Sequence, residues 1–203
     1  MKTNANTRYL VQLSLLAAVE LVLATTPLGY LHTFGLEISF LMVPVALGAI
    51  LLGPGAGAVL GGIFGLTSFG TCFGSSPFGA VLLGVDPVLT FLVCVPTRIL
   101  AGWLTGLLFR ALAKLGDEGK PSLAAFGAAS LAGPVLNTLL FMSGLVVCFY
   151  RTDYIQGIAQ SLGAANPFIF VVLFVGVQGL VEALVGFAVC GVLSKAVYRY
   201  LHR

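Results

Sequence analysis

The stretch Pro87–Lys114 reads PVLTFLVCVPTRILAGWLTGLLFRALAK, and Arg98 is the only charge in its first 23 residues. A helix that crosses the roughly 30 Å hydrocarbon core of a membrane needs about 20 mostly apolar residues, so this stretch is long enough to span it. A charged side chain inside hydrocarbon is costly and usually faces the interior of a helix bundle or a polar cavity. The stretch therefore predicts a membrane-spanning helix with a buried polar site at Arg98.

The rest of the chain has the same character. Of its 203 residues, 59% are hydrophobic and 8% are charged, and the mean hydropathy is +1.07. Such a composition is typical of integral membrane proteins. Breaks made by glycine, proline and charge clusters divide the chain into six candidate spans: Tyr9–Thr26, Leu36–Leu52, Gly55–Phe73, Pro87–Lys114, Ser122–Tyr150 and Pro167–Tyr200. We predict a single all-α domain over residues 1–203, an integral membrane bundle of six transmembrane helices.

The basic residues predict the orientation of this bundle. With six spans, both termini lie on one side, and that side collects these basic residues: Lys2, Arg8, Arg110, Lys114, Lys120, Lys195, Arg199 and Arg203. The other side has only Arg151. Because lysine- and arginine-rich loops stay in the cytoplasm, we expect both termini there, in a multi-pass protein of the cell membrane. The net charge of +3 then reflects topology, and nothing supports nucleic-acid binding.

Several classes of function lack their motifs. The four cysteines lie in or beside apolar spans, without C-x-x-C spacing or a histidine cluster, which indicates core residues rather than a metal site or disulfides. No G-x-x-x-x-G-K-[ST] phosphate loop occurs, so we expect no ATP site. Gly74-Ser75-Ser76-Pro77 matches only a fragment of a serine-hydrolase pattern, with His32 in a loop and His202 at the tail. We expect neither an enzyme nor a cofactor.

The first span carries two further features. Glu20 interrupts its apolar run, which favours a retained helix over a cleaved signal peptide. The carboxylate is expected either in a proton relay or as a partly protonated group that faces the bundle interior. Ser14 and Ala18 form a small-x-x-x-small pair, as do Gly102 and Gly106 in the fourth span. Such pairs serve either helix packing inside the chain or the docking of a partner.

Four polar side chains of the last three spans are expected at similar depths. At about 1.5 Å per residue from the outer helix ends, Arg98 lies about 16 Å deep, and Asn137, Gln178 and Glu182 lie about 16–22 Å deep. The planar fork of an arginine suits a carboxylate or a phosphate. In one interpretation Arg98 anchors an anionic ligand, and Asn137 and Gln178 bind its polar remainder. In the other, Arg98 and Glu182 form a structural ion pair. The two interpretations can coexist if the ligand competes for the pair or completes it, so Glu182 is also a candidate substrate-binding residue. Trp103 is either a stacking wall for the ligand or core packing.

The longest connections lie on the expected outer side. They are Pro27–Gly35, Gly74–Asp86 and Arg151–Asn166. Each alone is explained as a plain connection between helices. Three of them on one face, above intramembrane polar residues, suggest a lidded pocket that opens to the outside.

Glycine- and proline-rich motifs recur through the first half of the chain. They read Thr26-Pro27-Leu28-Gly29-Tyr30, Val43-Pro44-Val45-Ala46-Leu47-Gly48-Ala49, Leu52-Gly53-Pro54, Gly61-Gly62-Ile63-Phe64-Gly65-Leu66-Thr67-Ser68 and Pro96-Thr97-Arg98. With the six-span size, these motifs resemble the S-components, the substrate-binding subunits of energy-coupling factor (ECF) vitamin transporters. Within that family, Pro27–Ser68 is most similar to the pantothenate type.

The resemblance implies a division of labour. S-components bind a vitamin from outside and deliver it inward with a membrane T-component and two ATPase subunits. In this family a small-residue motif on the first helix, which Ser14 and Ala18 resemble, contacts the T-component. Pantothenate carries a carboxylate, hydroxyls and an amide, which Arg98, Asn137 and Gln178 would satisfy. The alternatives are an S-component for another vitamin, such as riboflavin or cobalamin, and a stand-alone proton-coupled carrier.

Overall fold

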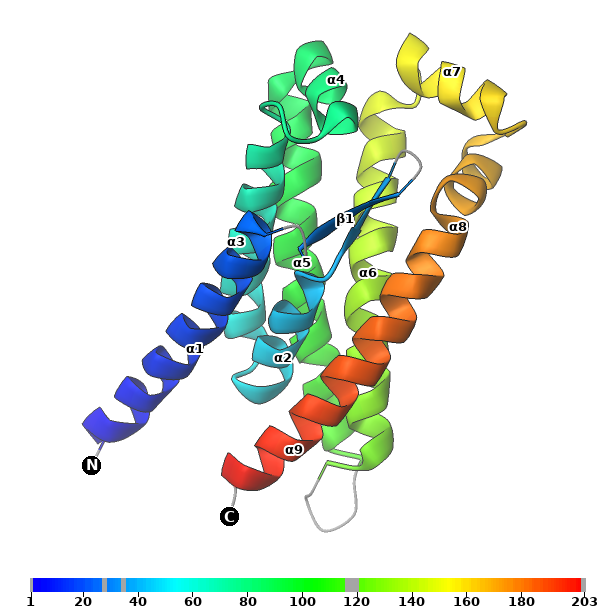
Figure 1. The fold of residues 1–203 in the computed structure, drawn as a ribbon. Helices are drawn as coiled ribbons and strands as arrows, with labels where there is room; N and C mark the ends of the chain where they lie inside the picture. The colour runs from blue at the N-terminus through cyan, green and yellow to red at the C-terminus, as the bar shows by residue number, and fades with distance from the viewer. Residues whose placement is uncertain (1, 27–28, 34–35, 116–120, 202–203) are drawn as a thin grey trace.

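The computed structural model describes residues 2–26, 29–33, 36–115 and 121–201, and helices dominate it (Figure 1). Residues 27–28 and 34–35, part of one predicted outer connection, lie outside the described residues. The elements, in chain order, are α1 (Lys2–Thr25), β1 (Tyr30–Thr33), β2 (Leu36–Ser39), α2 (Met42–Leu51), α3 (Pro54–Thr71), α4 (Pro77–Val85), α5 (Pro87–Ala113), α6 (Leu123–Phe149), α7 (Asp153–Ser161), α8 (Pro167–Val185), η2 (Gly186–Cys190) and α9 (Gly191–Leu201). The η2 segment is a π-helical turn that joins α8 and α9 into one long helix.

Several of these helices can cross a membrane. Within the described residues, four helical segments are long and apolar enough: Asn6–Thr25, Pro87–Ala113, Leu123–Phe149 and Gly179–Ala196. Two further apolar helical segments are shorter: Met42–Leu51 and Pro167–Gly176. The prediction of a helical membrane protein is confirmed at this level.

The second predicted span is wrong in its first part. Leu36–Ser39 forms β2, which pairs antiparallel with β1, and α2 begins only at Met42. Leu36-Glu37-Ile38-Ser39 alternates apolar and polar residues, which is the period of a strand. Among the described residues every strand belongs to this one hairpin, so the all-α prediction needs this single correction.

Two predicted outer connections contain short helices. The Ser76 hydroxyl accepts a hydrogen bond from the Gly79 N–H (3.2 Å), and the Thr152 hydroxyl accepts one from the Ile155 N–H (3.5 Å), so both helices have N-caps. The apolar face of α7 buries Ile155 and Ala159 in a core cluster. Figure 1 shows α4 and α7 at the end of the bundle opposite both termini. We call these two ends the α4–α7 end and the termini end.

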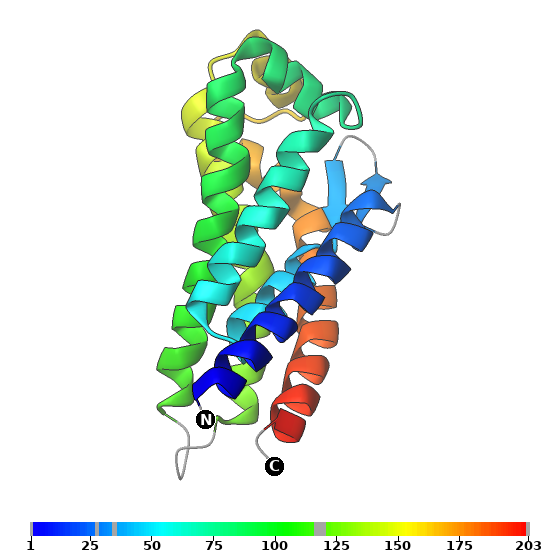
Figure 2. The ribbon, with the colours of Figure 1, turned by 90° about the vertical axis from the view of Figure 1, so that its left-hand side faces the viewer.

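Helices α3 and α5 lie side by side and pack through glycine (Figures 1 and 2). Gly57 and Gly102 lie backbone to backbone, with no room for a side chain on either. A Cβ atom added at Gly106 would lie 2.6 Å from the Cα atom of Pro54. Close backbone approach of this kind drives helix association in lipid. The Gly102 and Gly106 pair therefore serves packing inside the chain.

This packing predicts that Gly65→Ala destabilises the protein. A Cβ atom at Gly65 would lie 2.7 Å from the Cα atom of Val95 and 3.0 Å from the carbonyl oxygen of Cys94. Overpacking of this kind typically costs about 1–3 kcal/mol. Gly70→Ala is the control in the same helix, because nothing lies within 4 Å of its added Cβ atom. Thermal unfolding in detergent measures both variants, and a wild-type Tm for Gly65→Ala would contradict the close contact.

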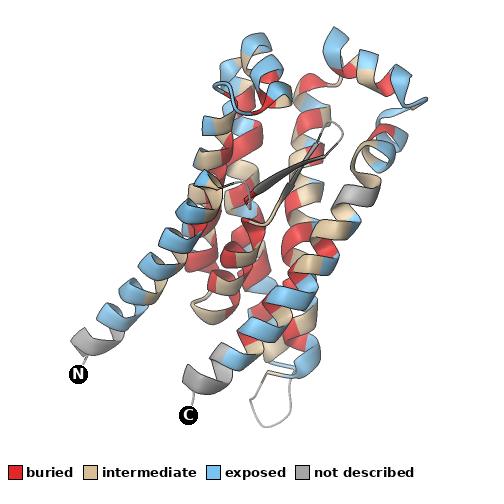
Figure 3. Cartoon of the chain, viewed as in Figure 1, coloured by how far each residue is buried: buried red, intermediate tan, exposed pale blue. Residues whose placement is uncertain are grey.

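The buried residues lie on the faces of the helices that point into the bundle (Figure 3). Cys72, Cys94 and Cys190 are buried and Cys148 is half-buried, and none of these four forms a disulfide within the described part of the chain. These positions agree with the prediction of small core residues. The outward faces of α1 and of the α8–α9 helix expose many apolar side chains.

Candidate functional site

Arg98 is buried near the middle of α5, with 7% of its surface exposed. Its Nη1 atom donates to the backbone oxygens of Cys94 (2.9 Å) and Val93 (3.4 Å), about one turn earlier in the helix. Helical side chains lean toward the N-terminus of their helix, and these bonds hold Arg98 in that direction. Because α5 begins at the α4–α7 end, the guanidinium group points toward that end.

Two aromatic rings enclose the guanidinium group. Its Cζ atom lies 4.8 Å from the ring centroid of Phe64 on α3 and 4.7 Å from that of Phe141 on α6. A cation over an aromatic face is stabilised electrostatically, most strongly where water is excluded. We call Phe64 and Phe141 the aromatic clamp. The two rings thus hold the guanidinium group from two neighbouring helices.

Arg98 forms no ion pair with any residue that the structure describes, and its Nε atom has no hydrogen-bond partner there. Glu182 on α8 lies within electrostatic range of Arg98. However, the Oε1 atom of Glu182 accepts a hydrogen bond from the backbone N–H of Ser39 (2.7 Å), at the end of β2. The structural Arg98–Glu182 ion pair, one of the two interpretations above, is therefore not formed. Glu182 instead ties the β1–β2 hairpin to α8.

Asn137 on α6 supplies a second unpartnered polar group. It is 8% exposed, and its Oδ1 atom has no hydrogen-bond partner among the described residues. Residues four apart share one face of a helix, so Asn137 lies on the face of α6 that carries Phe141, about 6 Å along the axis. A buried polar atom without a partner costs about 1–3 kcal/mol. A ligand that donates a hydrogen bond to Asn137 would remove this cost.

Gln178 and Trp103 are the remaining residues that the sequence predicted to contact the ligand. The backbone of Gln178 belongs to α8, but its side chain lies outside what the structure describes. Trp103 is 42% exposed on the outward face of α5, so the structure does not bring it to Arg98. Five residues along an α-helix rotate the side chain by about 140°, which places Trp103 well away from the face of Arg98. This exposure argues against core packing at Trp103, and its role as a stacking wall for the ligand stays a prediction.

Glu20 is fully buried on the inward face of α1. Its carboxylate lies near the backbone N–H of Phe64, but neither oxygen makes a hydrogen bond of ordinary geometry within the described part of the chain. Phe64 thus has Glu20 near its backbone and Arg98 against its ring. The structure places Glu20 in the bundle interior, as predicted, and a part in proton transfer stays a prediction.

Ser14 and Ala18 both lie on the exposed face of α1. Large apolar side chains surround them on this face: Leu10, Val11, Leu15, Val19 and Val22. The small pair therefore lies on a surface open to lipid or to another protein, and its role in docking stays a prediction.

Sequence reasoning missed three contributors to this site. The aromatic clamp comes from two distant segments, and only Phe141 had a signal, its spacing of four from Asn137. The third contributor, the Ser39 backbone N–H, leaves no trace in residue type. The candidate site therefore centres on Arg98, the aromatic clamp and Glu182, from α3, α5, α6 and α8. That Asn137 belongs to the same site stays a prediction.

A comparison with models of protein families identifies the family of this chain. A family model described as ECF transporter, substrate-specific component, matches residues 8–194. The chain therefore belongs to this family. It is a substrate-binding membrane subunit that works with ECF T and ATPase subunits, and the family is one of transporter subunits, not of enzymes. A search of curated proteins finds no match.

Proposed function

We infer that this S-component captures a small anionic vitamin from outside the cell and delivers it inward with a T-component and two ATPase subunits. The observation that supports this best is the state of Arg98, which is buried in the aromatic clamp without an ion pair among the described residues. A buried charge that forms no ion pair is costly, and Glu182 is within electrostatic range of Arg98 without pairing with it. A carboxylate or phosphate of the ligand would form that ion pair and bind Nε.

Pantothenate is the vitamin that we propose. Its carboxylate suits the Arg98 fork, and its hydroxyl or amide N–H would donate to the Oδ1 atom of Asn137, which lacks a partner among the described residues. Gln178 would bind a further polar group. Other vitamins carry the same groups, so S-components for riboflavin or cobalamin are the alternatives. The resemblance of Pro27–Ser68 to the pantothenate type favours the first.

The test is to identify the small molecules that copurify with the chain. Nanomolar binding, about −12 kcal/mol, survives purification in detergent. We expect mass spectrometry of the denatured protein to release pantothenate in near-stoichiometric amount. A different vitamin would replace pantothenate in the proposal. Uptake into vesicles that hold this chain alone, driven by a pH gradient, would instead support the proton-coupled carrier, with Glu20 or Glu182 as the proton site.

We also propose six membrane crossings with both termini in the cytoplasm. The described basic residues support this, because Arg8, Arg110, Lys114 and Lys195 belong to the segments nearest the termini end, whereas Arg151 precedes α7 at the other end. The crossings would be α1, α2, α3, α5, α6 and the α8–α9 helix.

Cysteine labelling tests this orientation. With a membrane-impermeant maleimide on intact cells, we expect Ser161→Cys to react at once. Arg8→Cys and Lys114→Cys should react only after permeabilisation. All three positions are exposed, whereas none of the native cysteines is. Labelling of Arg8→Cys and Lys114→Cys from opposite sides would contradict the count of spans between them.

A further inference from the structure

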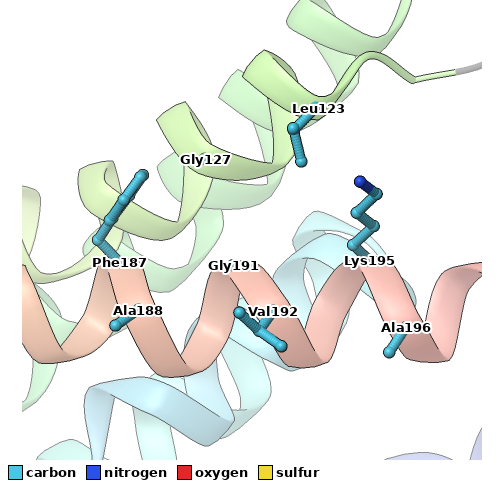
Figure 4. Close-up of a pocket in the computed structure, with 8 residues that line it drawn as sticks. All are labelled: Leu123, Gly127, Phe187, Ala188, Gly191, Val192, Lys195 and Ala196. Atoms are coloured by element: carbon cyan, nitrogen blue, oxygen red, sulfur yellow. The ribbon is translucent and has the colours of Figure 1, made fainter.

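A groove lies at the termini end of the molecule, between the start of α6 and the η2–α9 segment (Figure 4). Its volume is about 500 Å³, within the range of roughly 300–1,000 Å³ that small-molecule pockets occupy. It shares no lining residue with the Arg98 site. The groove is therefore a separate feature, which the capture of a vitamin does not use.

Small residues and the π-helical turn shape this groove. Gly127 on α6 leaves space beside the ring of Phe187, because an added Cβ atom would come 3.1 Å from a ring carbon. Phe187 belongs to the π-helical turn Gly186–Cys190, which widens the helix locally. Ala188 and Val192 continue the wall on the same helix. The result is an apolar slot bounded by two membrane helices.

One cationic side chain, that of Lys195, lines this otherwise apolar groove. Lys195 is half-buried, and its amine extends toward α6 near Leu123 (Figure 4). It has no ion pair or hydrogen bond with any residue that the structure describes. An apolar slot with a single unpaired cation complements an amphiphile that has an apolar chain and an anionic head. Basic pockets between membrane helices near the cytoplasmic surface bind anionic lipid headgroups in this way.

We propose that this groove holds one anionic phospholipid of the adjacent leaflet, with an acyl chain along Phe187 and Val192 and the phosphate at Lys195. Lipid tails reach such a groove by lateral diffusion, since it opens to the outside of the bundle. Two more described basic residues of this end, Arg110 and Lys114, belong to the last turn of α5 and its C-cap. The termini end is therefore the end where an anionic headgroup is favoured.

Lipid competition on the purified full chain tests the proposal. Equal amounts of palmitoyl-oleoyl phosphatidylglycerol and phosphatidylethanolamine are added, and native mass spectrometry counts the retained lipids. We expect the wild type to prefer phosphatidylglycerol about fivefold, the factor for one lysine near an anionic surface. Lys195→Gln should abolish this preference. Lys114→Gln, an exposed lysine that does not line the groove, should keep it.

A groove-filling variant provides the second measurement. Ala188→Trp places a large ring in the slot from an exposed position and should remove retention of both lipids, with vitamin binding unchanged as the check on folding. Equal retention of both lipids by the wild type would overturn the proposal, and so would an unchanged preference in Lys195→Gln. If Ala188→Trp blocks assembly with the T-component while lipid retention stays, the groove docks a protein and the proposal is also overturned.

Discussion

Replacing Arg98 with alanine is expected to abolish high-affinity vitamin binding. The guanidinium group is buried in the aromatic clamp, and its Nε atom has no partner among the described residues. Truncating one partner of a buried, hydrogen-bonded charge pair costs about 2–5 kcal/mol, so we expect affinity to fall ~30-fold to several thousand-fold. Isothermal titration of the purified chain measures this loss.

Two further variants serve as controls for Arg98→Ala. One separates the planar guanidinium group of Arg98 from its positive charge, and the other tests the loss of an arginine elsewhere in the same helix. Arg98→Lys keeps the positive charge but loses the planar fork and its stacking on the clamp, so we expect an intermediate loss. Arg110→Ala removes an exposed arginine from the same helix and should bind as the wild type does. The Tm of each variant without ligand tests whether it folds. Wild-type affinity in a folded Arg98→Ala variant would show that the arginine has only a structural role.

Replacing Glu182 with alanine is expected to release bound vitamin faster. The Oε1 atom of Glu182 accepts a hydrogen bond from the Ser39 backbone N–H (2.7 Å), which ties the β1–β2 hairpin to α8 near Arg98. Hydrogen bonds to charged groups contribute about 1.5–3 kcal/mol, so we expect the dissociation rate to rise ~10- to 150-fold. Displacement of labelled vitamin by an excess of unlabelled vitamin measures this rate.

Glu182→Gln is the matched control for this tether. Glutamine keeps a side-chain oxygen that accepts from the Ser39 N–H at nearly the same position, but it has no charge. We expect its dissociation rate to rise much less than that of Glu182→Ala. Equally fast release of vitamin by both variants would contradict the tether. It would show that the charge of Glu182, rather than its hydrogen bond to the hairpin, slows the release of the ligand.

The helical part of this fold was predictable because the length and apolar composition of membrane helices can be recognised in a sequence. Pro87–Lys114 and Ser122–Tyr150 match α5 and α6 to within one residue at each end. The hairpin was not predictable in the same way, because four alternating residues at Leu36–Ser39 continue directly into an apolar run. A helix and a strand cannot be distinguished there by periodicity alone.

The site residues were predictable only where a charged side chain interrupts an apolar span. Arg98 and Glu20 stand out because charges in hydrocarbon are rare. Phe64 and Phe141 do not stand out, since aromatic residues are ordinary in membrane helices and their meeting around Arg98 depends on how α3, α5 and α6 pack. Trp103 follows Arg98 by five residues, but these five residues place its side chain on a different face of α5.

The ligand carboxylate and Arg98 can be tested against each other in one binding experiment. Pantothenol differs from pantothenate in that an uncharged alcohol replaces the carboxylate. Wild-type protein should bind pantothenate at least ten times more tightly than pantothenol, and Arg98→Ala should lose most of this preference. Equal affinity of the wild type for the two compounds, or an undiminished preference in Arg98→Ala, would contradict the account that this buried arginine receives the anionic group of the vitamin.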